Sequence, residues 1–224
     1  MGTSPFDDPR VAGQYEDWYA SPFGRLADEL EQRMLYELTG DLAPGSRLIE
    51  IGCGTGHFAA ALRARFDTCF VVGIDAAHQM LRRAGDRVPV AQGDATTLPL
   101  ADASCDVAFV IALLDFVDEP VEVLQEALRV ARSHVVMLAL VSHSVLALRR
   151  RVSGSLGHPI FAAANFYSRR RIEGFVQTAG ARIVGRRQAL ALPPSLAGRL
   201  PGLERRLSRA NPPMGGILGL RIER

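Results

Sequence analysis

The sequence predicts an α/β protein with three layers, in which helices cover both faces of a mostly parallel β-sheet. Between residues 45 and 141, short apolar runs alternate with segments of helical spacing, a pattern typical of parallel sheets with right-handed crossovers. The apolar runs are continuous, as expected for strands that are buried on both faces. A glycine-rich turn, "GCGTG" at residues 52–56, joins the first apolar run to a helical segment.

Periodicity and turn residues place the individual elements. The segment 24–39 carries apolar residues three and four positions apart, and Gly40 and Pro44-Gly45 end it. Further helices are predicted at 55–66, 77–84, 120–131, 144–152 and 168–178. Strands are predicted at 47–51, 68–74, 88–92, 106–111, 134–141, 181–190 and 217–223. The proline-rich stretch 193–213 is expected to be an excursion between the last two strands.

The composition is that of a soluble globular protein. The 224 residues are 48% hydrophobic and 22% charged, and they fit one domain with a sizeable core. The longest apolar run, "VVMLALV" at 135–141, is much shorter than the roughly 18 residues that a membrane span needs. The N-terminal segment is acidic and has no apolar core like that of a secretory signal, so we expect a cytoplasmic protein.

Three cysteines, Cys53, Cys69 and Cys105, lie in or beside apolar runs. Their odd number and wide spacing favour reduced, packed thiols over disulfides or a metal centre. We therefore predict no metal site.

Charge is divided unevenly along the chain. Residues 1–140 carry 11 Arg and 21 acidic residues, a net charge of −10, whereas residues 141–224 carry 15 Arg and 3 Glu, a net charge of +12. Four arginine clusters account for most of this excess: 149–151, 169–171, 186–187, and 205–206 with Arg209. The clusters fit an anionic acceptor, an anionic membrane or solvated helix faces. Nucleic acid is disfavoured, because aromatic residues are not interleaved with the arginines.

The glycine-rich turn predicts a ligand site. A strand followed by such a turn and a helix N-terminus presents backbone N–H groups, and glycine lets a ligand approach closely. Glu50 lies just before the turn, Asp75 ends the second predicted strand, and Asp94 ends the third. Three carboxylates around one cleft suit a ligand with hydroxyls, an amine and positive charge, and they would repel a pyrophosphate. Asp75 is placed to accept hydrogen bonds from ribose hydroxyls.

Four motifs in order resemble those of the class I S-adenosylmethionine-dependent methyltransferases, of the type called methyltransferase-11. They are "LIEIGCGTGHF" (48–58), "VVGIDAAHQML" (71–81), "AQGDATTLPL" (91–100) and "CDVAFVIALLDFVDEP" (105–120). The resemblance covers residues 45–141, and the C-terminal "ILGLRIER" is similar to the family's antiparallel seventh strand. It implies a Rossmann-like fold with a seven-stranded sheet, in which only the last strand is antiparallel.

The resemblance also implies a cofactor, S-adenosyl-L-methionine, with S-adenosyl-L-homocysteine as its product. We expect it to be bound by Glu50, Gly52, Cys53, Gly54, Gly56, Asp75, Ala76, Met80, Gly93, Asp94, Ala95, Ile111, Tyr15 and Trp18. Residues 1–44 would form an N-terminal helical lid segment, and residues 45–141 the cofactor-binding core. Residues 142–224 would complete the same domain with acceptor-pocket inserts and the last two strands.

Two residues are candidates for catalysis. Asp115 follows the fourth predicted strand, and His143 stands just past the fifth, where it could act as a general base. Both could equally be polar residues of the loop surface. Tyr15 and Trp18 belong to an aromatic group in the N-terminal segment that would either cover the cofactor or pack onto the sheet.

The sequence therefore predicts a methyltransferase of small-molecule acceptors that works by in-line displacement, as a monomer or homodimer. The motif that typically marks enzymes acting on nucleic acid bases or amide nitrogens is missing, because the fourth strand ends in "VIALLD". Two alternatives stay open: a membrane-associated lipid or quinone methyltransferase, and a non-catalytic cofactor-binding protein on the same fold.

Overall fold

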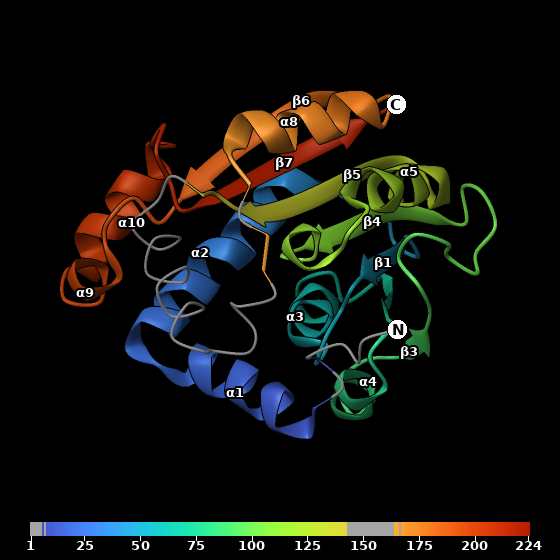
Figure 1. Cartoon of the computed structure of the whole chain (residues 1–224), viewed down its shortest axis with the longest axis horizontal. Coiled ribbons are helices and arrows are strands. Elements are labelled where there is room, and N and C mark those ends of the chain that lie inside the picture. Colours follow the sequence, from blue (N-terminus) through green and yellow to red (C-terminus); the bar gives the residue numbers. More distant parts are fainter. Residues whose placement is uncertain (1–5, 7, 143–163, 166) are drawn as a thin grey trace.

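A seven-stranded sheet with helices on both faces forms the body of the protein in the computed structural model, which describes residues 6, 8–142, 164–165 and 167–224 (Figure 1). Side chains of residues 9, 10, 12 and 14–16 are outside this description. The strand order is β3-β2-β1-β4-β5-β7-β6. The predicted fold class is confirmed: a Rossmann-like three-layer sandwich with an antiparallel last strand.

The first five strands are parallel and the last one is not. They are β1 (Arg47–Ile51), β2 (Phe70–Asp75), β3 (Val90–Gln92), β4 (Cys105–Ile111) and β5 (Ala131–Leu140). The strand β7 (Ile217–Glu223) lies antiparallel to β5 on one side and to β6 (Arg182–Ala189) on the other. Because β6 thus runs in the direction of β5, the carboxyl ends of six strands lie at one edge of the sheet, and the loops there can form a common site.

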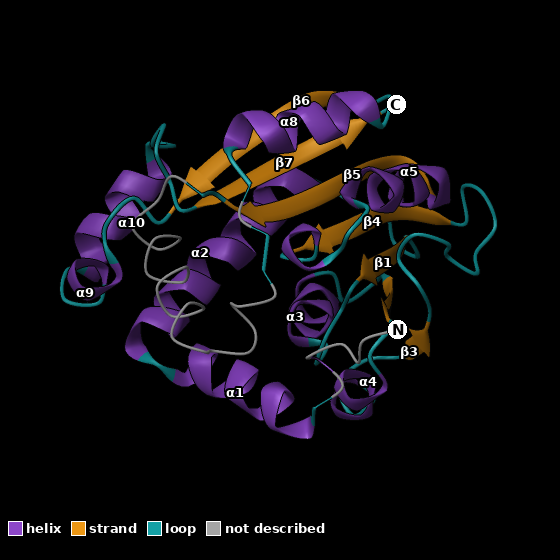
Figure 2. Ribbon diagram, viewed as in Figure 1, coloured by secondary structure: helices purple, strands orange, loops and turns teal. Residues whose placement is uncertain are grey.

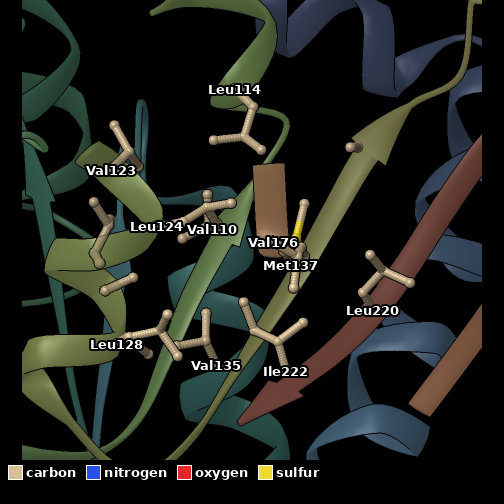
Figure 3. Close-up of a cluster of buried hydrophobic side chains, with 14 of the residues drawn as sticks. Val110, Leu114, Val123, Leu124, Leu128, Val135, Met137, Val176, Leu220 and Ile222 are labelled. Carbon is tan, nitrogen blue, oxygen red and sulfur yellow. The ribbon is translucent and has the colours of Figure 1, made fainter. Parts of the chain in front are cut away.

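Helices pack on both faces of the sheet (Figure 2). On one face, α2 (Pro22–Thr39) and α3 (His57–Arg65) bury residues such as Leu30, Leu38 and Leu62 against the sheet. On the other, α5 (Pro120–Val130) and α8 (Arg169–Thr178) bury Leu124 and Val176. Figure 3 shows this second core, where side chains of α5 and α8 meet those of β4, β5 and β7.

Two further helices are associated with the N-terminal half. The helix α1 (Pro9–Ala20) precedes α2, and Ser21 caps α2 by accepting a hydrogen bond from the Gly24 amide at 2.9 Å. The helix α4 (His78–Ala84) lies beside β2 and β3 and also contacts α1. No helix in the described ranges is both long and apolar enough to cross a membrane.

The predicted excursion at residues 193–213 contains two helices for which no prediction was made. They are α9 (Pro194–Ala197) and α10 (Pro201–Arg209). A proline stands in the first turn of each helix, where its missing N–H costs no hydrogen bond, so these prolines start helices instead of breaking them. The helix predicted at 144–152 lies outside the described residues.

Several arginines of the basic C-terminal half pair with acids of the N-terminal half. Arg205 lies 2.7 Å from Glu29, and Arg187 lies 2.9 Å from Glu37, so that α10 and β6 both contact α2 through ion pairs. These pairs are solvent-exposed, and each contributes little to stability by itself. Part of the charge asymmetry is thus an intramolecular match between the two halves of the chain.

Candidate functional site

A cavity of about 270 Å³ opens at the edge where the parallel strands end. The turns that follow β1, β2, β3 and β4 all contribute to its wall. The lining residues are Phe6, Gly52, Gly54, Asp75, Ala76, Ala77, Met80, Gly93, Asp94, Ala95, Ile111, Ala112, Leu113, Phe116 and Val117.

Backbone hydrogen bonds hold the glycine turn onto the end of β2. The amides of Gly52 and Cys53 donate to the carbonyl of Ile74 at 2.7 and 2.9 Å. The amide of Gly54 donates to Asp75 Oδ2 at 2.7 Å. Gly52, Gly54 and Gly56 all have positive φ, which glycine adopts without strain. A Cβ on Gly54 would meet no atom within 4 Å, so the chain leaves open space beside this backbone in the cavity wall.

Asp75 is oriented by the chain itself. Its Oδ2 accepts the Gly54 amide, and its Oδ1 accepts the Ala77 amide at 2.8 Å. Each carboxylate oxygen can accept more than one hydrogen bond, so a ligand hydroxyl can still bind here. Because Asp75 also lines the cavity, it can both fix the loop and receive a ligand.

Glu50 is buried behind the turn, with 2% of its surface exposed. It accepts a hydrogen bond from the Ala59 amide in the first turn of α3, whereas its Oε2 has no hydrogen-bond partner among the described residues. Burial, together with the nearby charge of Asp75, raises the pKa of Glu50 well above its usual value. Such a group would be stabilised as a carboxylate by a positively charged ligand near the turn.

Asp94 lies at the opposite rim and is exposed. The backbone amide and the hydroxyl of Thr96 both donate to its Oδ1, at 2.8 and 2.7 Å, and these bonds lower the pKa of Asp94. Its Oδ2 accepts no hydrogen bond from the described part of the chain. It therefore remains an anionic acceptor for a donor group such as an exocyclic amine.

The rest of the wall is apolar, and the N-terminal segment supplies part of it. The Phe6 ring meets the Phe116 ring edge-on, with centroids 5.0 Å apart. Both rings pack against a small buried cluster of Val11, Ala77 and Met80. The cavity is thus suited to a flat ring system with polar groups at its ends.

The structure brings together most of the residues predicted to bind a cofactor. Those that line the cavity are Gly52, Gly54, Asp75, Ala76, Met80, Gly93, Asp94, Ala95 and Ile111. Glu50, Cys53 and Gly56 stand behind this wall rather than on it. Burial raises the pKa of the Cys53 thiol, which is therefore a packed thiol and not a thiolate at neutral pH.

Trp18 packs away from the cavity. Its ring contacts Tyr19 and Phe23 edge-on, at centroid distances of 4.7 and 6.2 Å, and it belongs to the core under α2. Tyr19 in turn stacks on His57, whose Nε2 lies 2.7 Å from Asp28 Oδ1. These contacts join α1 and α2 to the start of α3. The side chain of Tyr15 lies outside the described residues.

Asp115, one of the two candidates for catalysis, does not line the cavity, although its neighbours do. It is 1% exposed, in a single 3-10 turn (Leu114–Phe116). Together with burial, its charge raises the pKa of Tyr167. Its side chain is therefore near the start of the C-terminal part rather than the cavity. His143 lies outside the described residues.

The sequence reasoning missed six residues of the wall: Phe6, Ala77, Ala112, Leu113, Phe116 and Val117. Four of these follow β4 within the fourth motif. The mostly apolar run "IALLDFV" after the strand could have indicated that this loop is part of the wall. Ala112 has φ +50°, a conformation rare for alanine, and it turns the chain so that Leu113 reaches Gly52. Phe6 carries no local signal, because its place depends on the tertiary fold.

Comparisons with known proteins agree with this geometry. Residues 49–139 match the family model described as "Methyltransferase domain". An uncharacterized protein of Mycobacterium tuberculosis is 31% identical over 193 residues, which is 84% of this chain and 64% of that protein. A malonyl-[acyl-carrier protein] O-methyltransferase of Xylella fastidiosa is 36% identical over 102 residues, covering 42% of this chain and 34% of the enzyme.

A crystal structure of an S-adenosylmethionine-dependent methyltransferase from Thermotoga maritima shares the fold. It superposes with a TM-score of 0.70 and 26% identity over 96% of each chain. The present chain spans somewhat less than two thirds of the length of the mycobacterial relatives that it matches.

Proposed function

We propose that the protein transfers the methyl group of S-adenosyl-L-methionine to a small-molecule acceptor. The match of residues 49–139 to the methyltransferase-domain family model and the shared fold support this proposal. The family uses this cofactor. The observation that carries the proposal is the placement of Asp75 and Asp94 around a cavity whose floor is the open backbone of Gly54.

The residues present fit this cofactor. Asp75 is placed for the ribose hydroxyls and Asp94 for the adenine amine, while Met80, Ile111 and Val117 supply an apolar surface for the base. At the glycine turn, the buried Glu50 would ionise beside a ligand that brings positive charge. A methionyl ammonium or a sulfonium would supply that charge.

When bound, the cofactor supplies an electrophilic methyl group on a sulfonium, which an acceptor displaces in line. The chain's task is to hold the donor and the acceptor in register and to exclude water. Leu113, Phe116 and Phe6 form an apolar wall that serves the second purpose. The described residues of the wall include no histidine or cysteine, and in this proposal they orient the donor.

The acceptor is proposed to be a small molecule. The Xylella relative is named for an acyl-carrier-protein substrate and an oxygen acceptor, but the match leaves out more than half of this chain. In this proposal the acceptor specificity is set by this chain's own C-terminal part, which carries α9, α10 and the last two strands. Asp115 and His143 remain candidates for positioning or deprotonating an acceptor.

Transfer of a labelled methyl group tests the proposal. The full chain is incubated with methyl-labelled S-adenosylmethionine and a fractionated metabolite extract, and label is followed into acceptor fractions by chromatography. We expect label in at least one small-molecule fraction, and loss of that label in Asp75→Ala. Cofactor binding without transfer to any fraction would instead favour the non-catalytic alternative on the same fold.

A further inference from the structure

We propose that the outer face of α9 and α10 is a docking surface for an anionic lipid membrane. This α9–α10 surface consists of Leu196, Arg199, Leu200, Leu203 and Arg206. It does not depend on the proposed methyl transfer, because it is argued only from exposure, charge and position.

The leucines of this surface are unusually exposed. Leu196, Leu200 and Leu203 have 40%, 45% and 44% of their surface exposed. Of the six large apolar side chains that are exposed in the described part, these three and Met214 fall within residues 196–214. The Leu200 amide donates to the Leu196 carbonyl and the Leu203 amide to the Leu200 carbonyl, so the three lie on consecutive turns. A cluster of this kind marks an interaction site, whereas isolated exposed leucines do not.

The leucines face outward because a charged residue occupies the inner face. Glu204 is fully buried, and its carboxylate accepts hydrogen bonds from the amides of Ala191 and Leu192 and from the Ser208 hydroxyl, at 3.0, 2.8 and 2.7 Å. This arrangement fixes the rotation of α10. Leu203 lies about 100° around the helix from Glu204 and is left in solvent. A helix that only needed to cover the core would be expected to bury the leucine and expose the acid.

The surface carries two arginines that pair with no acid among the described residues. Arg205 is paired with Glu29, but Arg199 and Arg206 are exposed and make no ion pair with any described residue. Between residues 194 and 211 the only acid is the inward-facing Glu204. Leucines flanked by arginines form the pattern of a helix that lies in a membrane interface and attracts anionic headgroups.

The same charge argues against a second copy of the chain as the occupant. A two-fold contact through this surface would bring Arg199 and Arg206 of both copies together without a compensating acid. An anionic bilayer offers both an apolar layer for the leucines and negative charge for the arginines.

The position of the surface agrees with such a role. In Figure 1 the arrowheads of β5 and β6 point toward the side where α9 and α10 stand, whereas β7 runs the other way. The helices follow the carboxyl end of β6. They therefore stand at the same end of the sheet as the cavity, and a membrane bound there would face the loops that surround it.

Vesicle co-sedimentation of the full chain tests the proposal. One set of vesicles is phosphatidylcholine alone, and the other contains about one fifth phosphatidylglycerol. We expect the wild type to bind the anionic vesicles preferentially, and this binding to weaken at least about fivefold when salt rises from roughly 0.1 to 0.5 M. Two double variants, Leu200→Ser with Leu203→Ser and Arg199→Glu with Arg206→Glu, should bind the anionic vesicles similarly weakly.

Matched controls use residues of similar exposure elsewhere. Val184 is 45% exposed on β6, and Arg170 is exposed on α8, so Val184→Ser and Arg170→Glu should bind vesicles like the wild type. Retained thermal unfolding midpoints exclude misfolding as the cause of a loss. The proposal is overturned if the wild type does not prefer anionic vesicles or if the surface variants bind them as well as the controls do. It is also overturned if the wild type is a dimer that binds no vesicles and the leucine variant is a monomer.

Discussion

Asp75 and Glu50 are carboxylates beside the same glycine turn, yet their surroundings give them different tasks. Asp75 accepts two backbone amides and still faces the cavity, which suits it to bind ligand hydroxyls. Glu50 accepts one amide in a buried site, where its pKa is raised well above the usual value. Each residue can be tested by a different measurement, since one acts on affinity and the other on the pH dependence of stability.

Replacing Asp75 with alanine should weaken cofactor binding by more than about tenfold, because it removes a ligand acceptor and frees the Gly54 and Ala77 amides that order the turn. Equilibrium dialysis with labelled S-adenosylmethionine measures the change. Asp86→Ala, an exposed acid in the turn after α4, serves as the control. Unchanged affinity in Asp75→Ala would remove Asp75 from the site.

Replacing Glu50 with glutamine should raise stability at neutral pH. The unfolded chain releases the Glu50 proton at about pH 4.3, whereas the folded chain retains it to higher pH, so the free energy of unfolding falls as the pH rises above that value. Glu50→Gln removes this loss. Near pH 4 the variant and the wild type should have nearly the same free energy of unfolding. Above the pKa of Glu50 in the folded chain, the variant should be more stable by about 1.4 kcal/mol for each unit between the folded and unfolded pKa values of Glu50.

Urea unfolding of both proteins across the pH range measures this difference, with the exposed Glu119→Gln as a matched control. A pH-independent difference between Glu50→Gln and the wild type would show that Glu50 titrates normally in the folded protein.

At the scale of elements, the turn after β1 and the helices after β6 show what local sequence can and cannot specify. The motifs at the strand ends were predicted, because continuous apolar runs and glycine or aspartate at their ends are local signals. The helices α9 and α10 were not, because a proline starts a helix or breaks one depending on its position. Phe6 and Leu113 reach the cavity only through tertiary contacts, which no local pattern records.

The turn after β1 depends on Gly52 for two reasons. Its φ is +72°, and a Cβ there would lie 2.6 Å from Leu113 Cδ1. Gly52→Ala should therefore lower the unfolding free energy by about 1–2 kcal/mol through backbone strain. It should also weaken cofactor binding by more than about tenfold, because Leu113 must move within the cavity wall.

Gly45→Ala separates the two effects. Gly45 also has positive φ, at +80°, but nothing lies within 4 Å of its Cβ position, and it precedes β1 at the opposite end of that strand from the cavity. It should lose similar stability and keep full affinity. Adding Leu113→Ala to Gly52→Ala should restore part of the lost affinity; no recovery would indicate that the turn itself, rather than Leu113, is displaced.

The α10 helix offers a contrast between a buried and an exposed carboxylate. Glu204→Ala frees two partly buried amides and the Ser208 hydroxyl, and should lower the unfolding free energy by about 2–4 kcal/mol in urea titrations. Glu29→Gln, which breaks only the exposed pair with Arg205, should have no measurable effect. Comparable losses in the two variants would mean that α10 is held mainly by its ion pairs with α2.

For the whole molecule, the division of charge has two consequences. Acids of α2 pair with arginines of β6 and α10, which joins the two ends of the chain around the sheet. Arginines left over, such as Arg199 and Arg206, lie on the surface proposed to meet a membrane. The fold could be predicted almost entirely, since its strands and motifs come in chain order, whereas the acceptor could not, because its pocket depends on how distant segments meet.

Calorimetric titration of the purified chain with S-adenosyl-L-homocysteine tests whether the cavity binds the cofactor. We expect saturable binding of one molecule per chain, with affinity in about the micromolar to sub-millimolar range expected of metabolic enzymes. Binding to Asp75→Ala should be weaker. Absence of saturable heat from the wild type up to millimolar ligand, for both this product and S-adenosylmethionine, would show that the cavity is not a site for this cofactor.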